Sequence, residues 1–82
     1  MRVVVTGGSG FIGSGFVRLL LAARPAWQVI NLDLLTYSGY PANLADVEHL
    51  PHYQFIQGDV ADPAMVRSAL RDAQAVVHFA AE

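Results

Sequence analysis

The chain has 82 residues, 54% of them hydrophobic, and a formal net charge of −2. A chain of this length holds one domain at most, and its five Lys and Arg residues form no basic tract, which argues against nucleic acid as a partner. It contains no cysteine, which excludes disulfides and thiolate chemistry and is typical of a cytoplasmic protein.

The first predicted strand covers residues 2–6 and leads directly into a glycine-rich turn. Its apolar part, Val3 to Val5, is too short for a signal peptide or a membrane span. We therefore expect a soluble, intracellular protein, located in the cytoplasm, with no membrane partner.

The turn after this strand contains glycines in two overlapping frames. Gly8, Gly10 and Gly13 match G-x-G-x-x-G, whereas Gly7, Gly10 and Gly13 match G-x-x-G-x-x-G. Such glycines let a pyrophosphate approach the backbone, and the first N–H groups of the following helix then point at its charge. A tight strand-to-helix turn without a ligand also selects glycine, so the motif alone leaves both interpretations open.

A second apolar run, residues 29–32, ends at Asp33, twenty residues after Gly13. A dinucleotide site needs a carboxylate at this place to accept hydrogen bonds from the adenosine ribose. The charge of Asp33 would repel the extra phosphate of NADP, and neither Leu34 nor Leu35 offers a cation to receive it, so NAD is favoured. The alternative is an ordinary strand-end residue that caps the next turn.

The rest of the chain alternates helices and strands, which predicts a parallel sheet with order 3-2-1-4 in a Rossmann-type, doubly wound α/β fold. The first helix should bury Phe16, Val17, Leu20 and Leu21, and the last Met65, Val66, Ala69 and Leu70. Asp62 and Pro63 should start that last helix. The expected elements are a helix over 11–24, a strand over 28–32, a short helix over 42–49, a strand over 53–57, a helix over 63–72 and a strand over 75–79.

Ligands of such sheets bind beyond the carboxyl ends of the strands. Asp59 could accept from the adenine amino group or from a nearby backbone N–H, and residues 58–59 could also be a simple turn. His49 and His52 lack a third ligand and are expected to be solvated rather than to hold a metal. We expect His78 to be a hydrogen-bonded core residue.

Several segments together resemble the amino-terminal part of the dTDP-glucose 4,6-dehydratases, enzymes of the extended short-chain dehydrogenase/reductase family. The most specific are Leu-Thr-Tyr-x-Gly after the aspartate and His-Phe-Ala-Ala-Glu at the end. The matching segments are residues 6–14, 32–39, 43–44, 58–60 and 78–82.

The resemblance implies that residues 1–82 are the first part of an NAD(P)-binding Rossmann domain, with NAD as the cofactor. It implies a full-length lyase, likewise cytoplasmic and homodimeric, that acts on a nucleotide sugar such as dTDP-glucose. Hydride passes from C4 to NAD, water is lost across C5 and C6, and hydride returns to C6. The cofactor-binding residues implied or argued above are Gly7, Gly10, Phe11, Ile12, Gly13, Asp33, Leu34, Leu35, Thr36, Ser38, Gly39, Asp59, Val60, Phe79, Ala80, Ala81 and Glu82.

No catalytic residue of that family is expected within this chain. The Tyr-x-x-x-Lys that supplies the general base is missing, because the sequence contains no lysine. We therefore expect the 82 residues to be inactive alone. Because the fourth strand would be left as an unpaired edge, we also expect them to be marginally stable or to aggregate alone. A sister enzyme of the family, such as a nucleotide-sugar epimerase or decarboxylase, and a non-catalytic nucleotide-binding module remain as alternatives.

Overall fold

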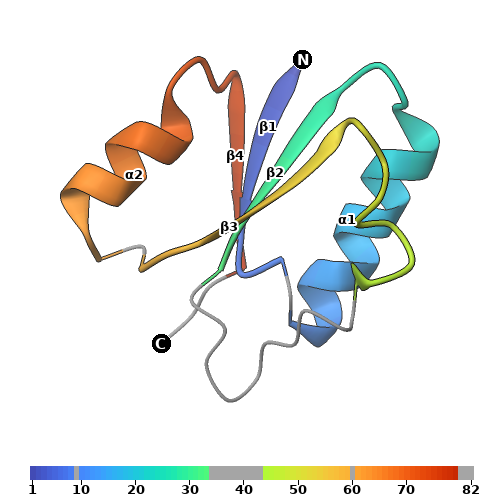
Figure 1. Cartoon of the computed structure of the whole chain (residues 1–82), viewed down its shortest axis with the longest axis horizontal. Coiled ribbons are helices and arrows are strands. Elements are labelled where there is room, and N and C mark those ends of the chain that lie inside the picture. Colours follow the sequence, from blue (N-terminus) through green and yellow to red (C-terminus); the bar gives the residue numbers. More distant parts are fainter. Residues whose placement is uncertain (9, 34–43, 60, 80–82) are drawn as a thin grey trace.

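The computed structural model describes residues 1–8, 10–33, 44–59 and 61–79. Within these residues a four-stranded parallel sheet has the order β3-β2-β1-β4, as predicted. Figure 1 shows the strands fanning out from one end of the sheet. The strands are β1 (Arg2–Thr6), β2 (Gln28–Asp33), β3 (Tyr53–Gln57) and β4 (Ala75–His78).

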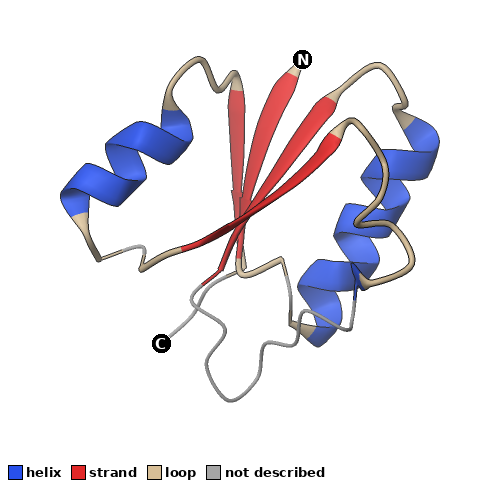
Figure 2. Ribbon diagram, in the orientation of Figure 1, coloured by secondary structure: helices blue, strands red, loops and turns tan. Residues whose placement is uncertain are grey.

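Two helices lie on opposite faces of this sheet, α1 (Phe11–Ala23) and α2 (Pro63–Leu70) (Figure 2). The start of α2 is as predicted, since the Asp62 carboxylate accepts hydrogen bonds from the backbone of the first turn and Pro63 follows it. The helix ends two residues earlier than expected. Arg71 leaves the helical region with ψ 128° and Asp72 has a positive φ of 63°.

The short helix predicted over 42–49 is wrong for its described part, in which Leu44 is in a 3₁₀ conformation and residues 45–49 form turns. The Val47 N–H donates to the Leu44 carbonyl at 3.0 Å, and the Leu50 N–H donates to the Val47 carbonyl at 3.0 Å. All three side chains belong to the core on the α1 side. In a chain that makes i→i+3 bonds, side chains three residues apart lie on the same side. In an α-helix the third of these side chains, that of Leu50, would point away from the first.

The larger core lies between the sheet and α1. Val17 and Leu21 are buried there, and Phe16 and Leu20 pack against them in part, so the apolar face predicted for this helix is confirmed. The sheet contributes Val3, Val5 and Val29. Because these three strand positions alternate in the sequence with residues of the other face, β1 and β2 are buried on both sides, as central strands of a parallel sheet are.

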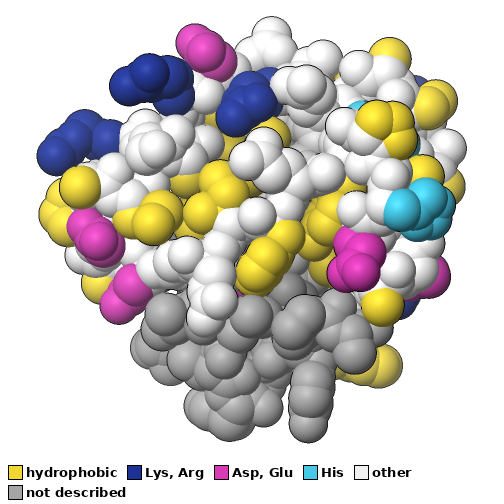
Figure 3. All heavy atoms as spheres, viewed as in Figure 1, with side chains coloured by type: hydrophobic (Ala, Val, Ile, Leu, Met, Phe, Trp, Pro, Cys, Tyr) yellow, Lys and Arg dark blue, Asp and Glu magenta, His cyan; other side chains and the backbone are white. Residues whose placement is uncertain are grey.

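A smaller core lies between the sheet and α2. Val4, Ile30, Leu32 and Ala69 are buried, while Val76 on β4 keeps 50% of its surface exposed. Figure 3 shows hydrophobic side chains at the surface of the viewed face, between the two helical sides. In the part of the chain that the structure describes, no helix is long and apolar enough to cross a bilayer.

Candidate nucleotide-binding site

The carboxyl ends of the four strands lie at one end of the sheet (Figures 1 and 2). Backbone hydrogen bonds continue each strand pairing to the first residue after β1, β3 or β4. These bonds run from Gly7 N–H to the Leu32 carbonyl (2.9 Å), from Gly58 N–H to the Asp33 carbonyl (3.1 Å) and from Phe79 N–H to the Thr6 carbonyl (2.8 Å).

Two glycines of the first loop have separate backbone reasons to be glycine. Gly7 has a φ of 73°, a conformation that side chains disfavour. A Cβ on Gly13 would overlap the Gly7 carbonyl oxygen and lie 2.9 Å from the Gly8 Cα. The first turn of α1 therefore packs directly on the backbone of the loop, as a close phosphate-binding turn requires.

Gly8 is glycine for a third reason. It is buried, and a Cβ there would lie 2.7 Å from Cγ of Asn31 and 3.1 Å from Cγ2 of Val17. The structure thus gives a role to one glycine from each of the two frames. Gly7 adopts the positive φ of the turn, and Gly8 packs against the Asn31 side chain of the sheet.

The amino end of α1 has the properties of an anion site. Gly10 is the N-cap and has no side chain that could cap the helix, and the first turn contains no acidic residue. Backbone N–H groups and the helix dipole at such an end favour a negative charge. The side chains of Phe11 and Ile12 are 90% and 71% exposed, so they leave this end accessible.

Asp33 is the last residue of β2, next to the loop, with only 9% of its surface exposed. Its role toward the ribose stays a prediction. Asp59 follows β3, and its Oδ1 accepts a hydrogen bond from the Ala61 N–H at 2.8 Å. This bond is the backbone alternative foreseen for Asp59, and its role toward adenine stays a prediction.

Asn31, in β2, and Tyr53, at the start of β3, were given no role by the sequence interpretation. Asn31 is completely buried, and its Nδ2 donates to the Tyr53 hydroxyl at 3.2 Å. Burial is the main cause that raises the pKa of Tyr53, and the hydrogen bond from Asn31 opposes it. The available signal was a single amide inside an otherwise apolar strand.

The side chains of His78 and Phe79, at the end of β4, lie on opposite faces of the sheet. The ring of Phe79 lies 5.4 Å from that of Phe16, so this side chain packs on α1. His78 is hydrogen-bonded to Thr6 as expected, but the expectation that it is a core residue is wrong, because its side chain is exposed. A strand at the edge of a sheet, covered on that face only in part, leaves alternate side chains in solvent.

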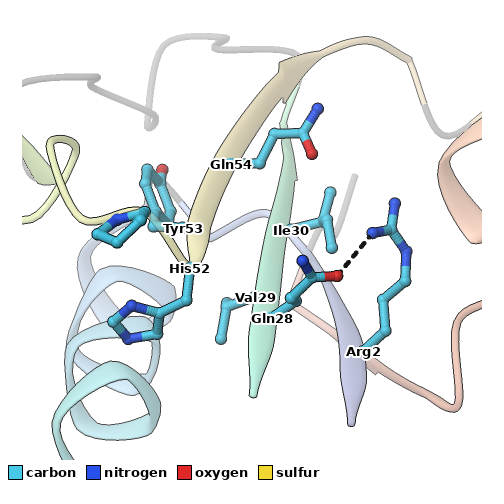
Figure 4. A pocket seen from close by; sticks show the side chains of 8 residues that line it. Arg2, Gln28, Val29, Ile30, His52, Tyr53 and Gln54 are labelled. Carbon is cyan, nitrogen blue, oxygen red and sulfur yellow. Dashed lines mark hydrogen bonds between the residues drawn. The ribbon is translucent and has the colours of Figure 1, made fainter. Parts of the chain in front are cut away.

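Other polar groups lie away from this end. His49 is exposed, and His52 Nε2 donates to the Leu21 carbonyl at 3.3 Å. Among the residues described, no three His, Cys, Asp or Glu side chains are grouped to hold a metal. A small pocket at the amino ends of the strands, which Arg2 and His52 help to line, is at the far end of the sheet from the glycine loop (Figure 4).

Nine of the predicted cofactor-binding residues lie outside the described residues. They are Leu34, Leu35, Thr36, Ser38, Gly39, Val60, Ala80, Ala81 and Glu82.

Residues 4–82 match the 3-beta hydroxysteroid dehydrogenase/isomerase family. The chain belongs to this family. Among curated members similar to it, a dTDP-glucose 4,6-dehydratase of Streptomyces niveus is 48% identical over 86 aligned residues, which cover all of this chain and 26% of that protein. The resemblance found in the sequence is thereby confirmed.

Two solved structures similar to this member of the 3-beta hydroxysteroid dehydrogenase/isomerase family are also dTDP-glucose 4,6-dehydratases. That of Bacillus anthracis, in complex with NAD, has a TM-score of 0.97 and 39% identity, and DesIV of Streptomyces venezuelae, with NAD bound, has 0.95 and 53%. Each match covers 100% of this chain and 27% of the other. The chain thus spans about a quarter of the length of the proteins it matches.

Proposed function

We propose that this chain is the NAD-binding, amino-terminal part of a Rossmann domain in a nucleotide-sugar 4,6-dehydratase. The observation that carries the proposal is the joint placement of the glycine loop, the uncapped start of α1 and the Asp33 carboxylate at the carboxyl end of the sheet. The likeness to dehydratase structures that contain NAD supports it.

The residues present fit a dinucleotide. The Gly7 conformation and the missing Cβ of Gly13 keep the loop close to the sheet. A pyrophosphate can therefore reach the N–H groups at the start of α1. Asp33 would accept hydrogen bonds from the adenosine ribose hydroxyls. NAD, when bound, supplies the capacity to accept and return hydride.

The substrate in this proposal is a nucleotide sugar such as dTDP-glucose, and the whole enzyme is a homodimer. The role of these 82 residues is to bind and orient the cofactor. They contain no lysine, so the tyrosine–lysine pair that the resemblance implies is not among them.

Calorimetric titration of the full chain with NAD and, separately, with NADP tests the cofactor. We expect heat of binding with NAD and at least tenfold weaker binding of NADP, because the Asp33 charge repels a further phosphate. Asp33→Asn should weaken NAD binding about tenfold and reduce the preference, since a hydrogen bond to a charged group contributes about 1.5–3 kcal/mol.

Asp46→Asn is the matched control. Asp46 is an exposed carboxylate that pairs with Arg18, so removing its charge should leave NAD binding unchanged. Absence of heat with NAD in the wild-type chain would contradict the proposal, and equal losses in both variants would contradict the role of Asp33.

A further inference from the structure

Asn31 lies directly under the glycine turn and is in contact with it. Both Asn31 and Gly8 are buried, and a Cβ on residue 8 would lie 2.7 Å from the Asn31 Cγ, a distance that Cβ atoms do not reach without displacement. Gly7, the neighbouring residue, is tied to β2 by its hydrogen bond to Leu32. The turn therefore packs on the Asn31 side chain and cannot lie closer to the sheet.

The Asn31 side chain is held from the other direction by Tyr53. Its Nδ2 donates to the Tyr53 hydroxyl at 3.2 Å, and Tyr53 projects from the start of β3 (Figure 4). The Tyr53 ring packs against the core on the α1 side. A ring packed in this way has few rotamers available, so the Tyr53 hydroxyl fixes the orientation of the amide from which it accepts.

An amide is a costly choice for this position. Val29, Ile30 and Leu32 show that the strand around it is otherwise apolar and buried. Burying an amide in such surroundings costs free energy unless it is hydrogen-bonded, and an apolar side chain would fill the space without this cost. The polar side chain is thus better explained by what it positions than by the volume it fills.

We propose that Asn31 is a positioning residue for the nucleotide site: supported by Tyr53, its side chain sets the height of the turn at Gly7 and Gly8 above the sheet. The path of the chain into α1, and with it the direction of the first N–H groups of the helix, follows from that height. The effect on NAD rests on the proposed function, whereas the contact between Asn31 and Gly8 does not.

A double-mutant cycle tests the contact through thermal unfolding of the full chain. Gly8→Ala should lower the melting temperature by about 10 °C, because the new methyl group meets Asn31. In Gly8→Ala/Asn31→Ala the nearer obstacle is gone and only the Val17 methyl group, at 3.1 Å, remains close, so the loss should be smaller than the sum of the two single losses by at least about 5 °C. Additive losses would overturn the proposal.

Gly13→Ala is the matched control, since its methyl group would meet the backbone of Gly7 and Gly8 rather than a side chain. Combining it with Asn31→Ala should give no recovery, and recovery there would overturn the proposal. If Gly8→Ala alone does not fold, a cooperative transition in the double variant supports the proposal and its absence overturns it.

Calorimetry with NAD separates positioning from stability. Asn31→Ala should bind NAD about tenfold more weakly at a temperature where it is folded, whereas Leu21→Ala, a core truncation in the last turns of α1, should bind as the wild type does. Equal affinities of both variants would overturn the positioning role. If the wild type itself does not bind NAD, the proposed function fails, and the unfolding cycle still decides whether Asn31 sets the turn.

Discussion

The Thr6 hydroxyl oxygen lies 2.5 Å from Nδ1 of His78, and this hydrogen bond joins β1 to β4 at their carboxyl ends. The two residues are direct partners in the register of the strands. Thr6 is buried and His78 is exposed. In the described part of the chain β4 is an edge strand that pairs only with β1. The side-chain bond therefore adds to the backbone hydrogen bonds that hold β4 on that one side.

His78→Ala should therefore destabilise the chain by about 1 kcal/mol, the usual net contribution of a hydrogen bond between side chains. Urea unfolding measures it. Val76→Ala, on the same face of β4, is the control. It removes a side chain that is 50% exposed and makes no hydrogen bond, and it should cost less than His78→Ala. A larger loss for Val76→Ala would contradict the role of the Thr6 bond.

The same substitution at two glycines of α1 should have opposite effects. At Gly13 a methyl group overlaps the backbone of Gly7 and Gly8, and Gly13→Ala should cost more than about 2 kcal/mol. At Gly15 a Cβ has no atom within 4 Å, and Gly15→Ala should stabilise by about 0.5–1 kcal/mol because alanine favours the helix. Urea unfolding of both variants decides, and a loss at Gly15 would show a contact that the structure lacks.

The strands could be predicted from the sequence because each apolar run is short and bounded by turn signals. β1 and β3 were predicted with their observed bounds, and β2 and β4 within one residue. The helix predicted over 42–49 failed because apolar residues three apart fit both an α-helix and a series of i→i+3 turns. Only packing against the core distinguishes the two.

The candidate site could be predicted in part for a similar reason. The spacing of the glycines and of Asp33 along the chain is a sequence property, and it identified the loop and the strand end. The contact between Gly8 and Asn31 joins the turn after β1 to β2 and depends on which face of the sheet the Asn31 side chain takes. A polar residue within an apolar strand gives no information about its partner until the strands are in register.

Tyr53 should make the chain lose stability in alkali. Burial raises the pKa of its hydroxyl above the ordinary 10.0, and the nearby charges of Glu48 and Asp33 act in the same direction. The folded state therefore holds this proton more tightly than the unfolded state, so the contribution to stability is complete below pH 10.0 and is lost as the pH rises through the raised value. Urea unfolding across this range should show a smaller alkaline loss for Tyr53→Phe than for the wild type, and equal losses would contradict the assignment.

The pair of Arg18 and Asp46 should be sensitive to acid instead. Arg18 in α1 donates to both carboxylate oxygens of Asp46, and this hydrogen bonding is the first cause that lowers the pKa of Asp46 below the ordinary 3.8. The pair helps hold the turns at 44–50 against the helix at pH values above 3.8, and this contribution is lost as the pH falls through the lowered value. The two side chains are 41% and 62% exposed, so salt should weaken the effect. In Arg18→Gln the carboxyl resonance of Asp46 should titrate nearer its ordinary value, whereas Arg24→Gln, which removes a cation at the end of α1, should leave it unchanged. An Asp46 titration that is the same in all three proteins would show that the pair does not form in solution.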